Sequence, residues 1–132
     1  MSQSVATLTN SLRIFRMIVP VFMLIHGITR IANHGVSPFG EFLSGIGIPL
    51  GFYLAWAITV FEIAGSVGMI LGYFVSAISI LFAIELSVGI LLVHRANGWF
   101  VVGAATGGME YSALLIACFL LMAFTSKRHR KQ

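Results

Sequence analysis

The chain has 132 residues, of which 58% are hydrophobic and only 9% are charged, and its mean hydropathy is +0.99. A soluble domain carries about 25% charged residues, so this composition excludes an ordinary soluble domain, and its hydrophobicity excludes a disordered chain. The single cysteine excludes a disulfide scaffold. Since a membrane-spanning helix needs about 20 apolar residues, the composition predicts one integral membrane domain over residues 1–132.

Four apolar segments predict an all-α fold, a bundle of four transmembrane helices. Each segment is too long for a strand and lacks the alternation of a barrel strand. Gly72 and Tyr73 are expected to end one span, because an unbroken helix over residues 50–93 would be about 65 Å long, twice the hydrocarbon thickness. The predicted spans cover approximately residues 12–32, 50–71, 73–93 and 109–125.

The connection after the first span predicts a short helix in the first outer loop. Ser37 and Pro38 are typical of a helix start, with Glu41 in the first turn. The following apolar residues have the spacing of an amphipathic helix on the membrane surface; they are Phe39, Phe42, Leu43 and Ile46. This helix either covers the bundle or forms a lid or lateral entrance for a lipid-soluble ligand.

The basic residues predict the orientation of the chain. Six of the eight lysines and arginines lie at the two ends, namely Arg13, Arg16, Lys127, Arg128, Arg130 and Lys131. By the positive-inside rule both termini are expected to be cytoplasmic, as four spans require. The short basic run at the C-terminus abuts a span, so we interpret it as attraction to anionic lipid and predict no nucleic-acid partner.

The four acidic residues are all glutamates, and two of them, Glu62 and Glu85, lie within apolar runs. Counting 1.5 Å per residue from the span ends places His26 and Glu85 about 12 Å, Glu62 about 18 Å and Arg30 about 6 Å below the outer face. An ionisable group inside the membrane costs at least about 2.5–3.5 kcal/mol, so these side chains are expected to face the interior of the bundle.

The loop over residues 94–108 contributes further polar residues at the outer rim, and its glycines allow His94 to approach Glu110. In a structural interpretation, Arg30 pairs with Glu62 or Glu85, and Arg95 pairs with Glu110. In a functional interpretation, favoured because His26 has no evident structural need, the same groups line a ligand-binding or proton-linked pocket. The candidate binding residues are His26, Arg30, Glu62, Glu85, His94, Arg95 and Glu110.

Several other chemistries do not fit the residues. A thiol–disulfide relay needs two cysteines, and zinc sites need closely spaced cysteine or histidine ligands, so no metal site is predicted. His26 and His94 differ by about 12 Å in estimated depth, which argues against haem ligation by both. Phosphate-binding glycine loops and a nucleophile elbow are absent from the sequence.

A series of short fragments, in order, resembles the DoxX family of small four-helix bacterial membrane proteins. The fragments are Gly27-Ile28-Thr29-Arg30, Gly47-Ile48-Pro49, Glu62-Ile63-Ala64-Gly65 with Gly68 and Gly72, His94 with Asn97-Gly98-Trp99-Phe100, and Gly108-Met109-Glu110-Tyr111. His26 and Glu85 do not belong to this pattern. The resemblance implies a multi-pass protein of the bacterial cytoplasmic (inner) membrane that is associated with oxidoreductases, such as the small membrane subunit of an archaeal thiosulfate:quinone oxidoreductase. It implies no flavin or metal.

Three functions remain open at this point. The first is a small subunit of a membrane redox complex that binds a quinone or another lipid-soluble molecule, with Arg30 or His94 polarising a carbonyl oxygen and a glutamate relaying the proton. The second is a transporter of small molecules or lipids, which would need a homo-oligomer because four spans are few for a carrier. The third is a non-catalytic assembly partner. The sequence assigns no reaction to the chain itself.

Overall fold

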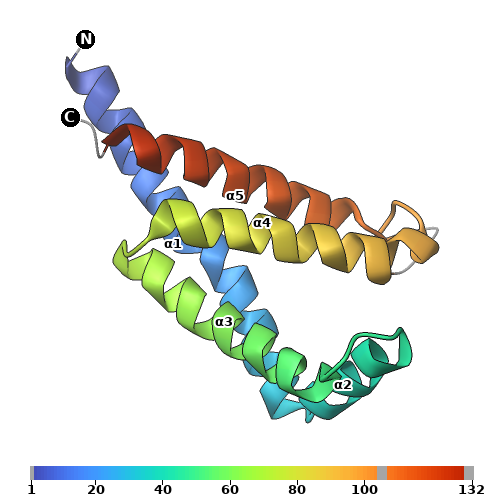
Figure 1. The fold of residues 1–132 in the computed structure, drawn as a ribbon. Coiled ribbons are helices and arrows are strands. Elements are labelled where there is room, and N and C mark those ends of the chain that lie inside the picture. Colours follow the sequence, from blue (N-terminus) through green and yellow to red (C-terminus); the bar gives the residue numbers. More distant parts are fainter. Residues whose placement is uncertain (1, 104–106, 130–132) are drawn as a thin grey trace. The chain divides into compact units, whose positions relative to one another are not determined.

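The computed structural model of the protein describes residues 2–103 and 107–129 (Figure 1). These residues form helices and no strand, which confirms the all-α prediction. The elements are α1 (Ser2–Ala32), α2 (Val36–Gly45), α3 (Gly51–Leu71), α4 (Val75–Leu92), the short 3-10 helix η1 (His94–Asn97) and α5 (Glu110–His129).

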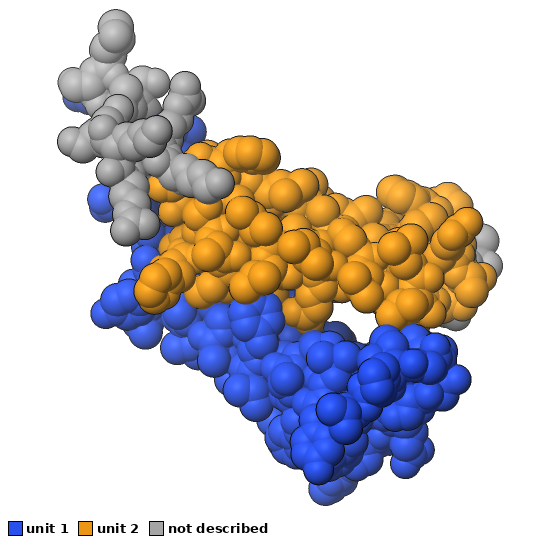
Figure 2. Space-filling view, in the orientation of Figure 1, with its two compact units in different colours: residues 1–73 blue, residues 74–132 orange. Residues whose placement is uncertain are grey.

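The chain divides into two compact units, Met1–Tyr73 and Phe74–Gln132, which Figure 2 shows in separate colours. Unit 1 contains α1, α2 and α3, whereas unit 2 contains α4, η1 and α5. Each unit is described by itself below.

Three of the described helices are long and apolar enough to cross a membrane, and they correspond to the first three predicted spans. They are Ala6–Ala32, Gly51–Leu71 and Val75–Leu92. The fourth predicted span lies in α5, whose described apolar part, Glu110–Ser126, is shorter. The count of four spans and the cytoplasmic position of both termini therefore stay predictions; Arg130 and Lys131, and the side chains of Lys127 and Arg128, lie outside the described residues.

Glycines set the close contacts of unit 1. A Cβ atom at Gly27 of α1 would lie 2.9 Å from Ile63 Cγ1 and 3.3 Å from the Thr59 carbonyl oxygen of α3. A Cβ atom at Gly40 of α2 would lie 2.7 Å from Phe52 Cα. Small residues let helix backbones approach each other, so the last two turns of α1 lie directly against the middle of α3.

The helix α2 confirms the short helix that the sequence predicts after the first span, but its buried face differs from the predicted stripe. Val36, Gly40 and Leu43 are buried, whereas Phe42 and Ile46 of the stripe are exposed. The reason is the close backbone contact between Gly40 and α3. Val36 and Leu43 lie one helical turn before and after Gly40, so they face α3 as well. The helix also begins at Val36, after Gly35, and has no side-chain cap.

The predicted break after the second span is confirmed. Gly72 has a φ of +92°, and its N–H donates to the Met69 carbonyl oxygen at 3.0 Å, while Tyr73 N–H donates to Gly68 O at 2.8 Å. These bonds satisfy carbonyls that a helix end leaves open, and the left-handed conformation favours glycine. As a result α3 ends after 21 residues, about 30 Å, which matches the hydrocarbon thickness.

In unit 2, α4 and α5 are held together mainly by apolar contacts. The rings of Phe82 and Phe119 are both fully buried and have centroids 5.0 Å apart. A hydrogen bond from Ser76 Oγ to the Ala123 carbonyl oxygen, at 3.1 Å, joins the same two helices near the start of α4.

Candidate functional site

The centre of unit 1 holds a buried carboxylate. Glu62 lies eleven residues after the first residue of α3 and nine before the last, so it is about 15 Å from either end of the helix. Its side chain is only 1% exposed. A carboxylate at this depth is stable as an anion only if other groups donate hydrogen bonds to it or carry the opposite charge.

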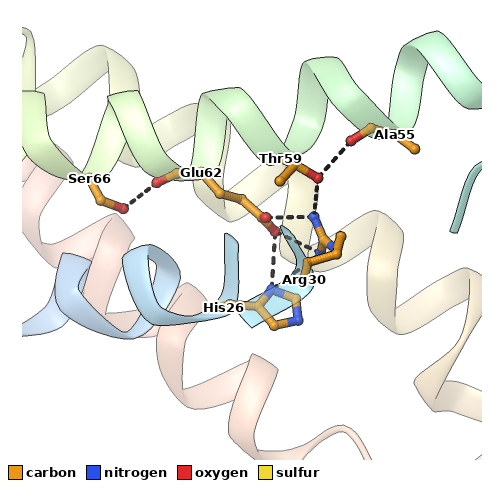
Figure 3. A network of polar contacts seen from close by, with 6 residues as sticks. All are labelled: His26, Arg30, Ala55, Thr59, Glu62 and Ser66. Atoms are coloured by element: carbon orange, nitrogen blue, oxygen red, sulfur yellow. Dashed lines mark hydrogen bonds and ion pairs between the residues drawn. The ribbon is translucent and has the colours of Figure 1, made fainter. Parts of the chain in front are cut away.

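Arg30 of α1 supplies that charge. Its Nη1 donates to Glu62 Oε2 at 2.6 Å and its Nη2 donates to Glu62 Oε1 at 3.0 Å, which makes a two-point ion pair. Nη1 also donates to the hydroxyl of Thr59 at 2.9 Å, and that hydroxyl donates to the Ala55 carbonyl oxygen (Figure 3). Of the two partners considered for Arg30, the structure therefore selects Glu62.

The same guanidinium contacts α2. The carbon Cζ of Arg30 lies 4.7 Å from the centre of the Phe39 ring, a cation–π contact. Its side chain is 13% exposed. Arg30 belongs to α1, Phe39 to α2, and Thr59 and Glu62 to α3. The guanidinium therefore joins all three helices of unit 1.

His26 is the one residue of this polar group whose side chain is largely exposed. Its Nδ1 lies 3.1 Å from Glu62 Oε1 and 3.3 Å from Arg30 Nη2, yet its side chain is 64% exposed. Figure 3 shows the second ring nitrogen, Nε2, on the side of the ring away from Glu62. In the tautomer that carries its proton on Nδ1, the ring donates to Glu62, which orients it and leaves Nε2 as the nitrogen that can bind another molecule.

Two functional residues of this site, Thr59 and Phe39, are absent from the sequence-based set. Thr59, Glu62 and Ser66 fall at positions i, i+3 and i+7 of α3 and are all buried. This polar stripe in an apolar helix is a signal from which Thr59 could have been found. Phe39 carries no comparable signal, since its role depends on where α2 lies.

The other four predicted residues belong to unit 2. Glu85 is partly buried in α4 and Arg95 is exposed in η1. His94 Nδ1 lies 2.8 Å from the Gly107 carbonyl oxygen, and Glu110 Oε1 accepts the Val101 N–H at 3.0 Å.

His94 and Glu110 thus both hold the backbone of the connection between η1 and α5. The ion pair between Arg95 and Glu110, which the structural interpretation assumes, is not formed among the described residues. The Glu110 carboxylate instead accepts the backbone N–H of Val101. No group of three or more residues that could hold a metal ion occurs within the described ranges.

A comparison with known families completes this description. The sequence profile of the DoxX family matches residues 11–95. The chain belongs to the DoxX family. The resemblance predicted from short fragments is thereby confirmed, although the match ends before the fragment around Glu110.

The matched region of this DoxX protein contains His26, Arg30 and Glu62 together with all of α2, α3 and α4. With three apolar helices long enough to span a bilayer, the family identifies the chain as a membrane protein. The comparisons with curated proteins and with solved structures gave no match.

Proposed function

We propose that this DoxX-family protein is a small subunit of a membrane redox complex and binds a quinone or another lipid-soluble molecule at His26. The observation that carries the proposal is the exposure of an imidazole whose other nitrogen faces a buried carboxylate. An exposed polar ring in an apolar helix long enough to span a bilayer is costly unless a ligand or partner uses it.

The chemistry of the group suits a ligand with a carbonyl or hydroxyl oxygen. With Nδ1 donating to Glu62, the Nε2 atom of neutral His26 accepts a hydrogen bond from a hydroxyl, and protonated His26 donates one to a carbonyl oxygen. Those are the reduced and oxidised forms of a quinone.

Arg30 has a positioning role in this proposal. The sequence suggested that Arg30 or His94 polarises the ligand, but the Nη1 and Nη2 atoms of Arg30 are engaged by Glu62 and Thr59. A guanidinium held in this way keeps the Glu62 carboxylate in place for His26.

Titration of the purified protein with a ubiquinone or menaquinone analogue tests the proposal. We expect saturable binding by the wild type and about ten-fold weaker binding by His26→Asn, the cost of losing one hydrogen bond. The matched control is His34→Asn, because His34 is exposed, lies outside the site and has a φ of +55° that asparagine tolerates. No binding by the wild type, or equal losses in both variants, would overturn the proposal.

A non-catalytic assembly role is the second candidate, and the three-helix linkage through Arg30 favours it. In that case Glu62→Gln lowers the yield of the assembled protein while analogue binding by the surviving fraction equals that of the wild type. Loss of analogue binding by a Glu62→Gln variant of normal yield would instead support the ligand site.

A further inference from the structure

A second cationic feature lies near the middle of α1, N-terminal to the candidate site. Arg16 is ten residues before His26, about 15 Å along the helix axis. Its guanidinium lies beside Gly72, in the turn that ends α3. A Cβ atom at Gly72 would be 3.4 Å from both Nη1 and Nη2 of Arg16. Since α3 has the length of the hydrocarbon core, we expect the turn at its end, and Arg16 beside it, to lie near one boundary of that core.

The hydrogen-bonding state of Arg16 is unusual for a residue in this position. Its side chain is partly buried, and its Nε atom is buried without a hydrogen-bond partner. Neither a hydrogen bond nor an ion pair is made by its guanidinium within the part of the chain that the structure describes. A partly buried guanidinium whose Nε atom has no hydrogen-bond partner is stabilised by a nearby anion.

Within unit 1, no acidic side chain is available to pair with Arg16. The carbonyl end of α3 contributes only a partial negative charge. Glu62 is bound to Arg30, and Glu41, the other acid of this unit, lies in α2.

We propose that Arg16 binds a phosphate group at this boundary, supplied by the headgroup of an anionic phospholipid or by free phosphate. The planar guanidinium matches two phosphate oxygens at once. Arg13, exposed one turn earlier on α1, adds a second positive charge, and exposed Tyr73 beside Gly72 is a residue type typical of the lipid headgroup level. This site is separate from the proposed ligand site at His26 and does not depend on it.

Native mass spectrometry of the full-length protein, with phosphatidylglycerol and phosphatidylcholine at equal concentration, tests this proposal. We expect the wild type to retain phosphatidylglycerol preferentially, and Arg16→Gln to weaken that retention about five-fold. Arg95→Gln removes the same charge from an exposed position in unit 2 and is expected to retain the lipid as the wild type does. Arg16→Lys keeps the charge without the planar fork and should fall between the wild type and Arg16→Gln.

Addition of inorganic phosphate separates the two sources of the ligand. Retention of lipid in its presence assigns the site to a headgroup, and displacement assigns it to free phosphate; both support a phosphate site. Equal retention of the two lipids by the wild type, unchanged by inorganic phosphate and by Arg16→Gln, overturns the proposal, as does an equal loss in Arg16→Gln and Arg95→Gln. If Arg16→Gln does not fold, the proposal is tested by the lipid preference of the wild type and by the lipid retention of Arg16→Lys.

Discussion

At the scale of single residues, the chemistry of unit 1 depends on one buried charge and the groups around it. Glu62 is held by Arg30, and Arg30 is held in turn by Thr59 and Phe39. The net gain from such a pair is small, because both ions lose their hydration. Removal of one partner is nevertheless costly, since it leaves the other charge buried without compensation.

We therefore expect Arg30→Met to destabilise the protein by about 3–5 kcal/mol. The double variant Arg30→Met with Glu62→Leu removes both charges and should be closer to the wild type than either single variant. Unfolding of the purified protein in detergent, followed by circular dichroism, measures the three variants. A double variant that loses the sum of the two single losses would contradict this account.

Thr59 has a smaller expected effect. Thr59→Val removes the acceptor for Arg30 Nη1 and should cost about 1.5–3 kcal/mol, the range for a hydrogen bond to a charged group. Thr59→Ser keeps the hydroxyl and serves as the control in the same unfolding measurement. If valine and serine are equally well tolerated, the hydroxyl does not support Arg30.

At the scale of helices, close backbone contacts decide which residues meet. Gly27 allows α1 to reach α3 beside Glu62, and Gly40 allows α2 to reach the start of α3. Without these contacts neither His26 nor Phe39 would lie near the ion pair. The positions of the glycines therefore matter more for the site than the overall hydrophobicity of the helices.

Gly40→Ala tests this dependence. The new Cβ atom would lie 2.7 Å from Phe52 Cα, which is backbone and must shift, so we expect a loss of about 1–3 kcal/mol. Gly89→Ala is the matched control, because Gly89 lies in α4 with nothing within 4 Å of its Cβ position. There alanine should be neutral or stabilise the helix by up to about 1 kcal/mol. Equal stability changes in the two variants would show that α2 does not need this close approach.

At the scale of the whole molecule, the number of membrane crossings determines where the two ends of the chain lie. Three described helices meet the length and hydropathy of a span, and α5 has a shorter apolar part. The basic residues at both ends of the sequence argue for an even number of crossings, which requires α5 to cross as well.

Reporter fusions at each terminus test this prediction in cells. We expect an N-terminal and a C-terminal fluorescent protein to be active on the cytoplasmic side, whereas a C-terminal alkaline phosphatase should be inactive there. A C-terminal phosphatase that is active outside the cytoplasm would mean an odd number of crossings. In that case the positive charges after Thr125 would not set the orientation.

The amino-acid sequence alone determines the features that the bilayer imposes. Long apolar runs are required wherever a helix crosses hydrocarbon, so α1, α3 and α4 can be located from hydropathy, and Gly72 can be recognised as the point where α3 must end. The scarcity of charge also makes Glu62 and Arg30 recognisable as unusual residues of an apolar chain.

The tertiary structure decides which of these residues meet. Depth along a helix follows from the sequence, but the choice of Glu62 as the partner of Arg30 depends on the contact of α1 with α3 at Gly27. The buried face of α2 likewise follows from its contact at Gly40 and not from apolar spacing alone. Such contacts depend on the shapes of two surfaces together, and a periodic pattern in one helix contains only half of that information.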